Sequence, residues 1–365
     1  DGLSVLSREG DSASSGGTFT GHTGKAVVDE SEIIYFPGAL IGVAATKNSG
    51  IWYDESGTVE TFAKEGQNVT GITGDNAWLG NVSATLTAGG VGIGFTAALQ
   101  NNPDNASVKT ATAKNAAIFG GSVGALEVVA RKGDEIPDLG KLSTFSAVSR
   151  NRNDDYAFIS LLSISTVAPV VSATNDQVLM ARVAGTTELV ARENTTLLTD
   201  GIKPARFGHF YIANDGVVIF QAWGTGAGIT TANDGFLCRW TVADGIEVLA
   251  REGSAAPGTG SSYGGFQAFS VSPSGAVVLQ STLTNVRITL QRALPGGALG
   301  HVIHTTQNVT FNGTSRSVLS LAIHTTGVGP GGGGNGHGAA INDEGAIFTV
   351  LSLGNSDYVA RILKP

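Results

Sequence analysis

The fold is decided by a stretch that begins with Asn214-Asp215-Gly216-Val217-Val218-Ile219-Phe220, continues with Phe236-Leu237-Cys238-Arg239-Trp240 and ends with Ile246-Glu247-Val248-Leu249-Ala250-Arg251. These runs are rich in β-branched, aromatic and other apolar residues, and Gly, Asn and Asp supply the turns between them. An earlier apolar run ends near Ile212. We therefore predict four strands, up to residue 212, at 217–222, at 236–240 and at 246–251, in one antiparallel sheet.

The same unit recurs along the chain. A short apolar run that ends in a basic residue occurs at Arg8, Lys64, Arg131, Arg192, Arg251 and, in a degenerate copy, His304. A polar turn followed by an apolar run gives a second series, which aligns on Phe36, Phe95, Phe158, Phe220, Leu279 and Thr349. Such a long, regular period indicates repeated supersecondary units, and both series count six.

The two ends of the chain suggest how the units are arranged. The last apolar run, residues 357–362, corresponds to the third strand of a unit, whereas the first run, residues 3–8, corresponds to a fourth strand. Pairing of these two runs would remove an exposed sheet edge. The predicted fold is all-β: a six-bladed β-propeller of four-stranded antiparallel blades, one domain over residues 1–365, in which the N-terminal strand 3–8 completes the last blade.

The fourth strand of each unit has a regular pattern. A small residue, such as Ala63, Ala130 or Ala250, precedes the basic residue and would let a neighbouring blade approach. Strict alternation along a strand would place Glu127, Val129 and Arg131 together on the opposite face.

Composition excludes several classes of protein. Charged residues make up 14% and hydrophobic residues 41%, which argues against a disordered chain. Cys238 is the single cysteine, so neither an internal disulfide nor a thiolate zinc cluster can form. The net charge of −8 argues against nucleic acid as a partner. No apolar run approaches the ~20 residues that span a membrane.

Three segments carry a resemblance to a known family. Residues 151–158, 342–345 and 250–258 resemble the tandem N-x-x-G-x-x-A-F repeats of bacterial surface proteins that carry assorted C-terminal anchors. The resemblance implies a propeller-like repeat fold and a surface location, and it brings no catalytic residues. The low lysine content and a start at Asp1 also favour a secreted, periplasmic or cell-surface protein.

Charged residues recur at equivalent positions. The basic series from Arg8 to His304 would form a ring, which we interpret as structural because the fourth strand is the outermost of a blade. The acidic loop residues are Glu9, Asp11, Glu65, Asp134, Glu135, Asp138, Glu193, Asp200 and Glu252. Carboxylates suit Ca²⁺, but no Asp-x-Asp-x-Asp-Gly loop occurs, so solvated turns are the favoured interpretation. No other cofactor is indicated.

Histidine and cysteine offer little catalytic chemistry. His301 and His304 are three residues apart, which on a regular strand places them on opposite faces and disfavours a chelate. His22, His209, His324 and His337 lie in different units. Cys238 lies in an apolar run and is expected to be an inert buried thiol.

Two loops stand out by composition. Residues 327–338 are rich in glycine and interrupt the sixth unit, as a flexible insertion would. Residues 164–171 are mostly apolar, and unless the loop folds back they would be exposed. The candidate interaction residues of this loop are Ile164, Val167, Pro169, Val170 and Val171.

These observations predict a non-enzymatic extracytoplasmic structural or interaction module that binds protein partners, self-assembles or joins a larger surface assembly. One alternative is a propeller hydrolase or lyase acting on polysaccharide, with loop carboxylates such as Asp134 and Asp200 as general acid and base. Another is a Ca²⁺-dependent glycan-binding protein.

Overall fold

The protein is all-β, as predicted. The computed structural model describes residues 5–69, 77–105, 107–311, 313–323, 339–354 and 356–363, apart from the side chains of residues 83 and 84. Strand accounts for 58% and helix for 2% of the structure. The chain divides into two compact units that change over between Val178 and Leu179.

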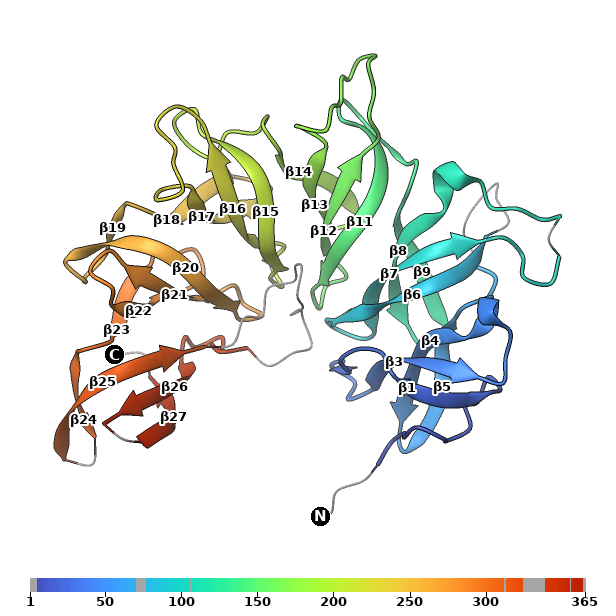
Figure 1. Ribbon diagram of the computed structural model, residues 1–365, viewed down its shortest axis with the longest axis horizontal. Coiled ribbons are helices and arrows are strands. Elements are labelled where there is room, and N and C mark those ends of the chain that lie inside the picture. The colour runs from blue at the N-terminus through green and yellow to red at the C-terminus, as the bar shows by residue number, and fades with distance from the viewer. Residues whose placement is uncertain are drawn as a thin grey trace. The chain divides into compact units, whose positions relative to one another are not determined.

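The described residues form six antiparallel sheets (Figure 1). The first contains β1 (Thr18–His22), β3 (Ile34–Ile41), β4 (Ser49–Glu55) and β5 (Thr58–Lys64), with β2 (Val27–Val28) paired to β3. The second contains β6 (Trp78–Ala88), β7 (Ile93–Gln100), β8 (Ala116–Ser122) and β9 (Ala125–Arg131). The third contains β10 (Glu135–Ile136), β11 (Gly140–Arg150), β12 (Tyr156–Leu162), β13 (Gln177–Val183) and β14 (Thr186–Arg192).

The remaining three sheets repeat this order. The fourth contains β15 (Lys203–Ile212), β16 (Val218–Thr225), β17 (Gly235–Thr241) and β18 (Gly245–Arg251). The fifth contains β19 (Ala255–Ala256), β20 (Ser261–Val271), β21 (Val277–Leu283), β22 (Ile288–Ala293) and β23 (Gly300–His304). The sixth contains β24 (Asn308–Phe311), β25 (Thr314–Ala322), β26 (Ile347–Leu353) and β27 (Ser356–Ile362). The order and pairing of the four strands predicted up to residue 251 are confirmed. Their ends agree to within two residues, except that β16 continues to Thr225.

The predicted closing strand is not seen in the described residues. Residues 5–8 form no strand, and β27 pairs with β26 alone within its sheet. The expected strand also included residues 3 and 4, which lie outside the described residues, as do the glycine-rich residues 327–338, His324 and His337.

The residues that mark the repeat form the cores of the sheets. Phe95, Phe158, Phe220 and Leu279 are at most 1% exposed, and Phe36 and Thr349 are also buried. In the first unit, Phe95 stacks on Phe119 with ring centroids 5.4 Å apart. The hydrophobic pattern alone therefore located each core correctly.

A register shift recurs where the last two strands of a sheet pair. In the second sheet Ile118 pairs with Ala130 and Phe119 with Val128, so Val129 is the extra residue of a β-bulge. The predicted alternation was wrong for this reason. Arg131 shares a face with Val128, and Glu127 shares a face with Ala130.

Buried polar residues tie the hairpin between β6 and β7 to its neighbours within the first unit. The Arg150 guanidinium donates to the carbonyls of Gly89 and Val91, at 2.6 and 3.0 Å, and forms an ion pair with Asp154. From the other side, a carboxylate oxygen of Asp29 accepts the N–H of Gly92 at 2.7 Å. These bonds fix the strand pair that forms the floor of the pocket described below.

Candidate functional site

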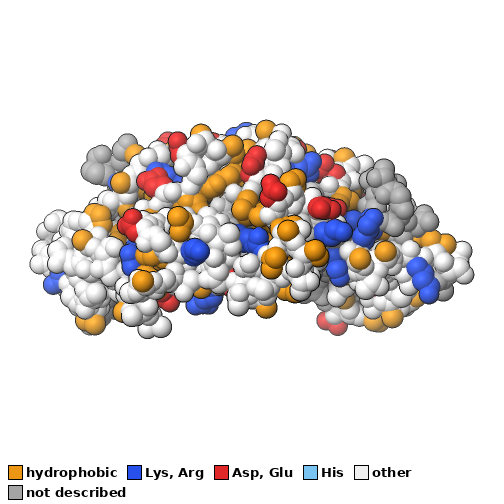
Figure 2. Space-filling view, turned by 90° about the horizontal axis from the view of Figure 1, so that it is seen from above, with side chains coloured by type: hydrophobic (Ala, Val, Ile, Leu, Met, Phe, Trp, Pro, Cys, Tyr) orange, Lys and Arg blue, Asp and Glu red, His pale blue; other side chains and the backbone are white. Residues whose placement is uncertain are grey.

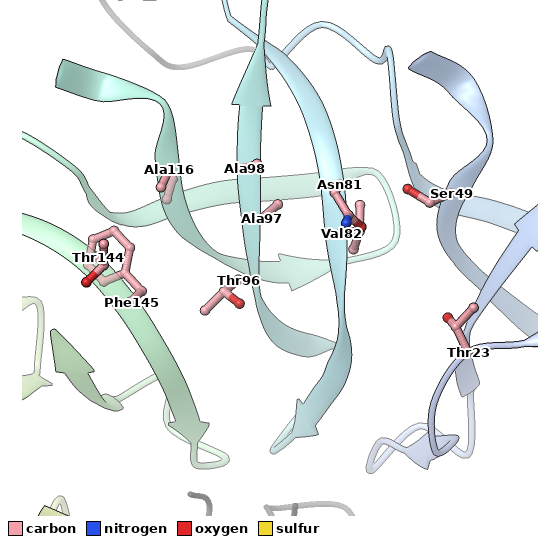
Figure 3. Close-up of a pocket in the computed structure, with 11 residues that line it drawn as sticks. Thr23, Ser49, Asn81, Val82, Thr96, Ala97, Ala98, Ala116, Thr144 and Phe145 are labelled. Atoms are coloured by element: carbon pink, nitrogen blue, oxygen red, sulfur yellow. The ribbon is translucent and has the colours of Figure 1, made fainter. Parts of the chain in front are cut away.

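A pocket of about 530 Å³ opens in the first unit (Figure 3). Its described lining comes from three sheets. In the first sheet Thr23 follows β1 and Ser49 begins β4. The second sheet contributes Asn81 and Val82 on β6, Thr96, Ala97 and Ala98 on β7, and Ala116 and Ala117 on β8, and the third contributes Thr144 and Phe145 on β11. The volume lies within the range of about 300–1,000 Å³ typical of small-molecule sites.

Small side chains open the pocket. Ala98 pairs with Ala116, and Ala97 with Ala117, across β7 and β8. In the fourth sheet the equivalent pairs are Trp223 with Gly235 and Ala222 with Phe236. The second sheet therefore has alanine where the fourth has Trp223 and Phe236. Each large ring buries about 150–250 Å², so its replacement by a methyl group leaves space.

In the fourth sheet the equivalent space is filled. Phe236 is fully buried, and the Arg206 guanidinium lies over the Trp223 ring at 3.7 Å from its centroid. The fourth sheet thus has large side chains where the second sheet has the alanines of the pocket.

β-Bulges orient the polar lining. On β6 the register shifts between Leu79 and Val82, beside Asn81, and on β11 it shifts on either side of Thr144 and Phe145. A bulge bends its strand and redirects side chains, and such features are frequent next to binding sites. The side chains of Asn81 and Thr144 are exposed and available to a ligand.

The described lining is uncharged and combines apolar side chains with several polar groups. Thr23, Ser49, Thr96 and Thr144 contribute hydroxyl groups, Asn81 an amide, and Phe145 an aromatic ring. Hydroxyls and amides both donate and accept hydrogen bonds. This combination suits a neutral ligand that has both hydroxyl groups and apolar faces.

A carboxylate outside the described lining, that of Glu65, fixes the lining residue Ser49. Glu65 Oε2 accepts hydrogen bonds from Ser49 Oγ and from the backbone N–H of Asn48, both at 3.2 Å. The corresponding Glu252 accepts the N–H of Gly235 at 2.9 Å, and burial raises the pKa of its carboxyl. These two glutamates, singled out in the sequence, therefore fix the start of the third strand of their sheets.

The predicted basic series has local roles in the structure. Lys64 Nζ donates to the carbonyl of Ser15, Arg131 Nε to that of Lys114, and Arg251 Nε to that of Asn233, at 2.9, 3.0 and 3.3 Å. Asp11 and Asp134 accept the backbone N–H groups of Arg8 and Arg131. These contacts agree with the structural interpretation of both series.

The proposed general acid and base do not contribute to the pocket. Neither Asp134 nor Asp200 is among its described lining residues. Over the part of the chain that the structure describes, no group of three or more His, Cys, Asp or Glu side chains could hold a metal ion.

The predictions for Cys238 and for the pair His301 and His304 had different outcomes. Cys238 is fully buried, and burial raises the pKa of its thiol. The prediction for His301 and His304 was wrong, because their rings lie on one face with centroids 5.3 Å apart. The cause is a bulge in β23, which shifts the register between Ile303 and His301.

The candidate interaction loop folds back on itself. Ser165 and Val171 exchange two backbone hydrogen bonds of 3.0 and 2.9 Å. Val171 is consequently buried, whereas Ile164, Val167 and Val170 are 61, 74 and 59% exposed. Pro169 lies within this hairpin, so exposed apolar surface is present on only part of the predicted set.

Sequence reasoning missed the pocket residues. A signal was present, because aligning Phe95 with Phe220 places Ala98 against Trp223. The bulges that bring Asn81, Thr144 and Phe145 to the pocket leave no comparable mark in the sequence.

The sheets and the pocket define an all-β protein with a neutral cleft among the described residues of its first unit. The chain belongs to a family of unknown function, DUF7453, whose model matches residues 1–291. No curated protein matches the chain. Neither short helix in the described part, η1 (Ala45–Lys47) or η2 (Thr112–Lys114), is long enough to cross a membrane.

Several solved structures resemble the chain at low identity. The α-L-arabinofuranosidase Arb93A of Fusarium graminearum is 9% identical, with 80% of this chain and 87% of that chain covered and a TM-score of 0.36. The periplasmic gluconolactonase PpgL of Pseudomonas aeruginosa is 9% identical, with 93% and 88% covered and a TM-score of 0.36. The Aleuria aurantia lectin is 10% identical, with 93% and 96% covered and a TM-score of 0.32.

The comparisons overturn the main functional prediction. A non-enzymatic structural or self-assembling module was expected, whereas the similar solved structures include an arabinofuranosidase, an arabinanase and a gluconolactonase. That prediction was wrong.

Proposed function

We propose that the pocket of the first unit binds a neutral saccharide. The observation that carries the proposal is its uncharged lining, which includes hydroxyl groups, the Asn81 amide and the aromatic ring of Phe145 (Figure 3). A sugar presents hydroxyl groups at its edge and C–H groups on its faces. Hydrogen bonds to Asn81 and Thr144 would fix its orientation, and Phe145 would contact an apolar face.

The described lining of this pocket supplies groups that can bind a sugar, and any cleavage would need carboxyl groups from elsewhere in the chain. Glycoside hydrolysis generally uses a pair of carboxyl groups about 5–9.5 Å apart. The described lining contains no carboxylate, and Glu65 is engaged in hydrogen bonds with Ser49 and Asn48. Binding through hydroxyl and amide groups also needs no Ca²⁺, so chelation with EDTA is expected to leave affinity unchanged.

The proposal is tested by calorimetry with arabinobiose, methyl α-L-fucoside and galacturonic acid as probes. We expect binding of a neutral sugar and none of the acid. Ala98→Trp introduces the side chain found at the equivalent position of the fourth sheet and should abolish binding. Phe145→Ala should weaken binding at least about tenfold, or 1.4 kcal/mol.

Ala125→Trp is the matched control, because Ala125 is exposed at the start of β9 in the same sheet and lies outside the pocket lining. Equal binding by Ala98→Trp and the wild type would contradict the proposal. Chromatography of the arabinobiose mixture after incubation separates cleavage from binding, because only cleavage releases arabinose.

We also propose that the six sheets are the blades of a single closed propeller, with residues 3–8 as the closing strand. The six-fold repeat count and the six antiparallel sheets of the described residues support this arrangement. One edge of β27 has no partner strand among the described residues and would accept the closing strand.

We further propose an extracytoplasmic location on a bacterial surface. The resemblance of residues 151–158 and 342–345 to tandem repeats of bacterial surface proteins supports it, as does the single cysteine. A saccharide-binding site would find its ligands there.

A further inference from the structure

We propose that His301 and His304 on β23 form a binding site for a divalent transition-metal ion such as Cu²⁺, Ni²⁺ or Zn²⁺. This inference is independent of the saccharide pocket, because β23 belongs to the second unit. It rests on the local geometry of the strand, on the spacing of the two rings and on the hydrogen bonds of their nitrogen atoms.

The β-bulge in β23 brings the two side chains to one face. His304 pairs with Thr289 and His301 with Gln291 on β22. Thr289 and Gln291 are two residues apart and share a face of the sheet, so their partners share it too. Without the extra residue, Val302, the two imidazoles would lie on opposite faces.

The spacing of the rings fits a shared ion. Imidazole nitrogens bind Zn²⁺ at about 2.0–2.1 Å, and two imidazoles on one ion at roughly tetrahedral angles have centroids about 5 Å apart. The observed centroid distance is 5.3 Å, with 47° between the ring planes. The centroid spacing of the two rings therefore matches that of two imidazoles bound to one ion.

The hydrogen bond of His304 leaves its other nitrogen available. Nδ1 lies 2.7 Å from the carbonyl oxygen of Thr305, and a carbonyl only accepts, so Nδ1 carries the proton. In the neutral ring Nε2 then has a free lone pair. A backbone carbonyl on the opposite ring nitrogen is the usual outer partner of a metal-binding histidine.

His301 has a buried nitrogen that needs a partner. Its Nε2 is inaccessible to solvent and has no hydrogen-bond partner among the described residues. Such an atom calls for an explanation, and a bound ion supplies one.

The ligand set determines which ions bind. Two imidazoles suit Cu²⁺, Ni²⁺ and Zn²⁺, and they do not suit Ca²⁺ or Mg²⁺, which prefer oxygen. Water would complete the coordination, since no third His, Cys, Asp or Glu joins the pair among the described residues. We expect one ion per chain, with affinity increasing from Co²⁺ through Ni²⁺ to Cu²⁺.

The test is calorimetric titration of the whole chain with NiCl₂ and ZnCl₂, together with the Cu²⁺ electron paramagnetic resonance spectrum. His301→Gln and His304→Gln should each weaken binding more than about tenfold, because removal of even an outer-shell partner costs 10–100-fold. The Cu²⁺ spectrum should show coupling to two nitrogen atoms in the wild type and to fewer in each variant.

His22→Gln is the matched control, because His22 is exposed and lies in the first unit. Its affinity should equal that of the wild type. Thermal melts without metal establish that each variant folds, and added Ni²⁺ should raise the melting temperature of the wild type and of His22→Gln only. Unchanged affinity in both His301→Gln and His304→Gln, or an equal loss in His22→Gln, would overturn the site.

Discussion

Arg150 is the residue on which the first unit most depends. Its side chain is almost fully buried, and it donates to the carbonyls of Gly89 and Val91 and, through Nε, to the Tyr156 hydroxyl at 3.2 Å. A buried guanidinium is tolerated only when such partners replace water. Loss of the side chain would leave two carbonyls and the Asp154 carboxylate without this donor.

We therefore expect Arg150→Met to lower the free energy of unfolding by about 3–5 kcal/mol, measured by urea denaturation. Arg152→Met is the matched control two residues away. Arg152 is exposed and forms a 3.4 Å ion pair with Glu30, so its loss should cost no more than about 1 kcal/mol. A similar cost for both variants would show that the buried network is not important for stability.

Sequence reasoning located apolar residues better than polar ones. Phe158 and Phe220 were located as landmarks of the repeat, and the structure buries both. Arg150 was not singled out, because burial of a charged residue depends on carbonyls that come from a distant hairpin. The pocket in the first unit was missed for a related reason, because the small size of Ala98 becomes informative only when it is compared with Trp223 in another repeat.

At the level of elements, the close approach of Tyr156 to β8 is a sharp constraint. Gly120 lies in the middle of β8, and a Cβ atom there would overlap the Tyr156 hydroxyl. That hydroxyl cannot move easily, because Arg150 holds it by a hydrogen bond. Burial raises the pKa of Tyr156 to about 12, as expected for an enclosed phenol.

Gly120→Ala should accordingly lower the melting temperature by several degrees, corresponding to about 1–3 kcal/mol from overpacking. In a Tyr156→Phe background the same substitution should cost less, because the overlapping oxygen is gone. Gly300→Ala serves as the control, since its added Cβ meets nothing closer than 3.9 Å. Additive effects of Gly120→Ala and Tyr156→Phe would contradict the proposed contact.

The strands themselves were predictable, whereas their irregularities were not. Turn residues such as Asn214-Asp215-Gly216 bounded β16 correctly. The bulges in β6, β11 and β23 depend on how each strand meets its neighbour, so they are absent from the local pattern. These bulges position Asn81 and Phe145, and they bring His301 beside His304. The candidate sites therefore lie where β-bulges interrupt the regular alternation of side chains along a strand.

For the molecule as a whole, the two repeat series predicted six units, and the described residues form six sheets. Figure 2 shows both acidic and basic side chains on one face of the molecule. The proposed closure of the six sheets depends on the pairing of residues 3–8. The local sequence pattern constrains this pairing only weakly. Closure by residues 3–8 is thus the prediction that most needs a direct measurement.

Hydrogen exchange over β27 provides this measurement. In an edge strand alternate backbone amides face away from the sheet and exchange quickly, whereas a strand paired on both sides protects every amide. If residues 3–8 close the last blade, all amides of residues 357–362 should exchange slowly in the full chain. Deletion of residues 1–9 should make alternate amides fast and promote aggregation through the bared edge.

Strand β21 is the internal control, because it pairs with β20 on one side and β22 on the other. Its amides should stay protected in both proteins if the deletion leaves the fifth sheet folded. Alternate fast exchange in β27 of the full chain, unchanged by the deletion, would show that the N-terminal residues do not complete the blade. The sixth sheet would then end at β27, and the ring would need another means of closure.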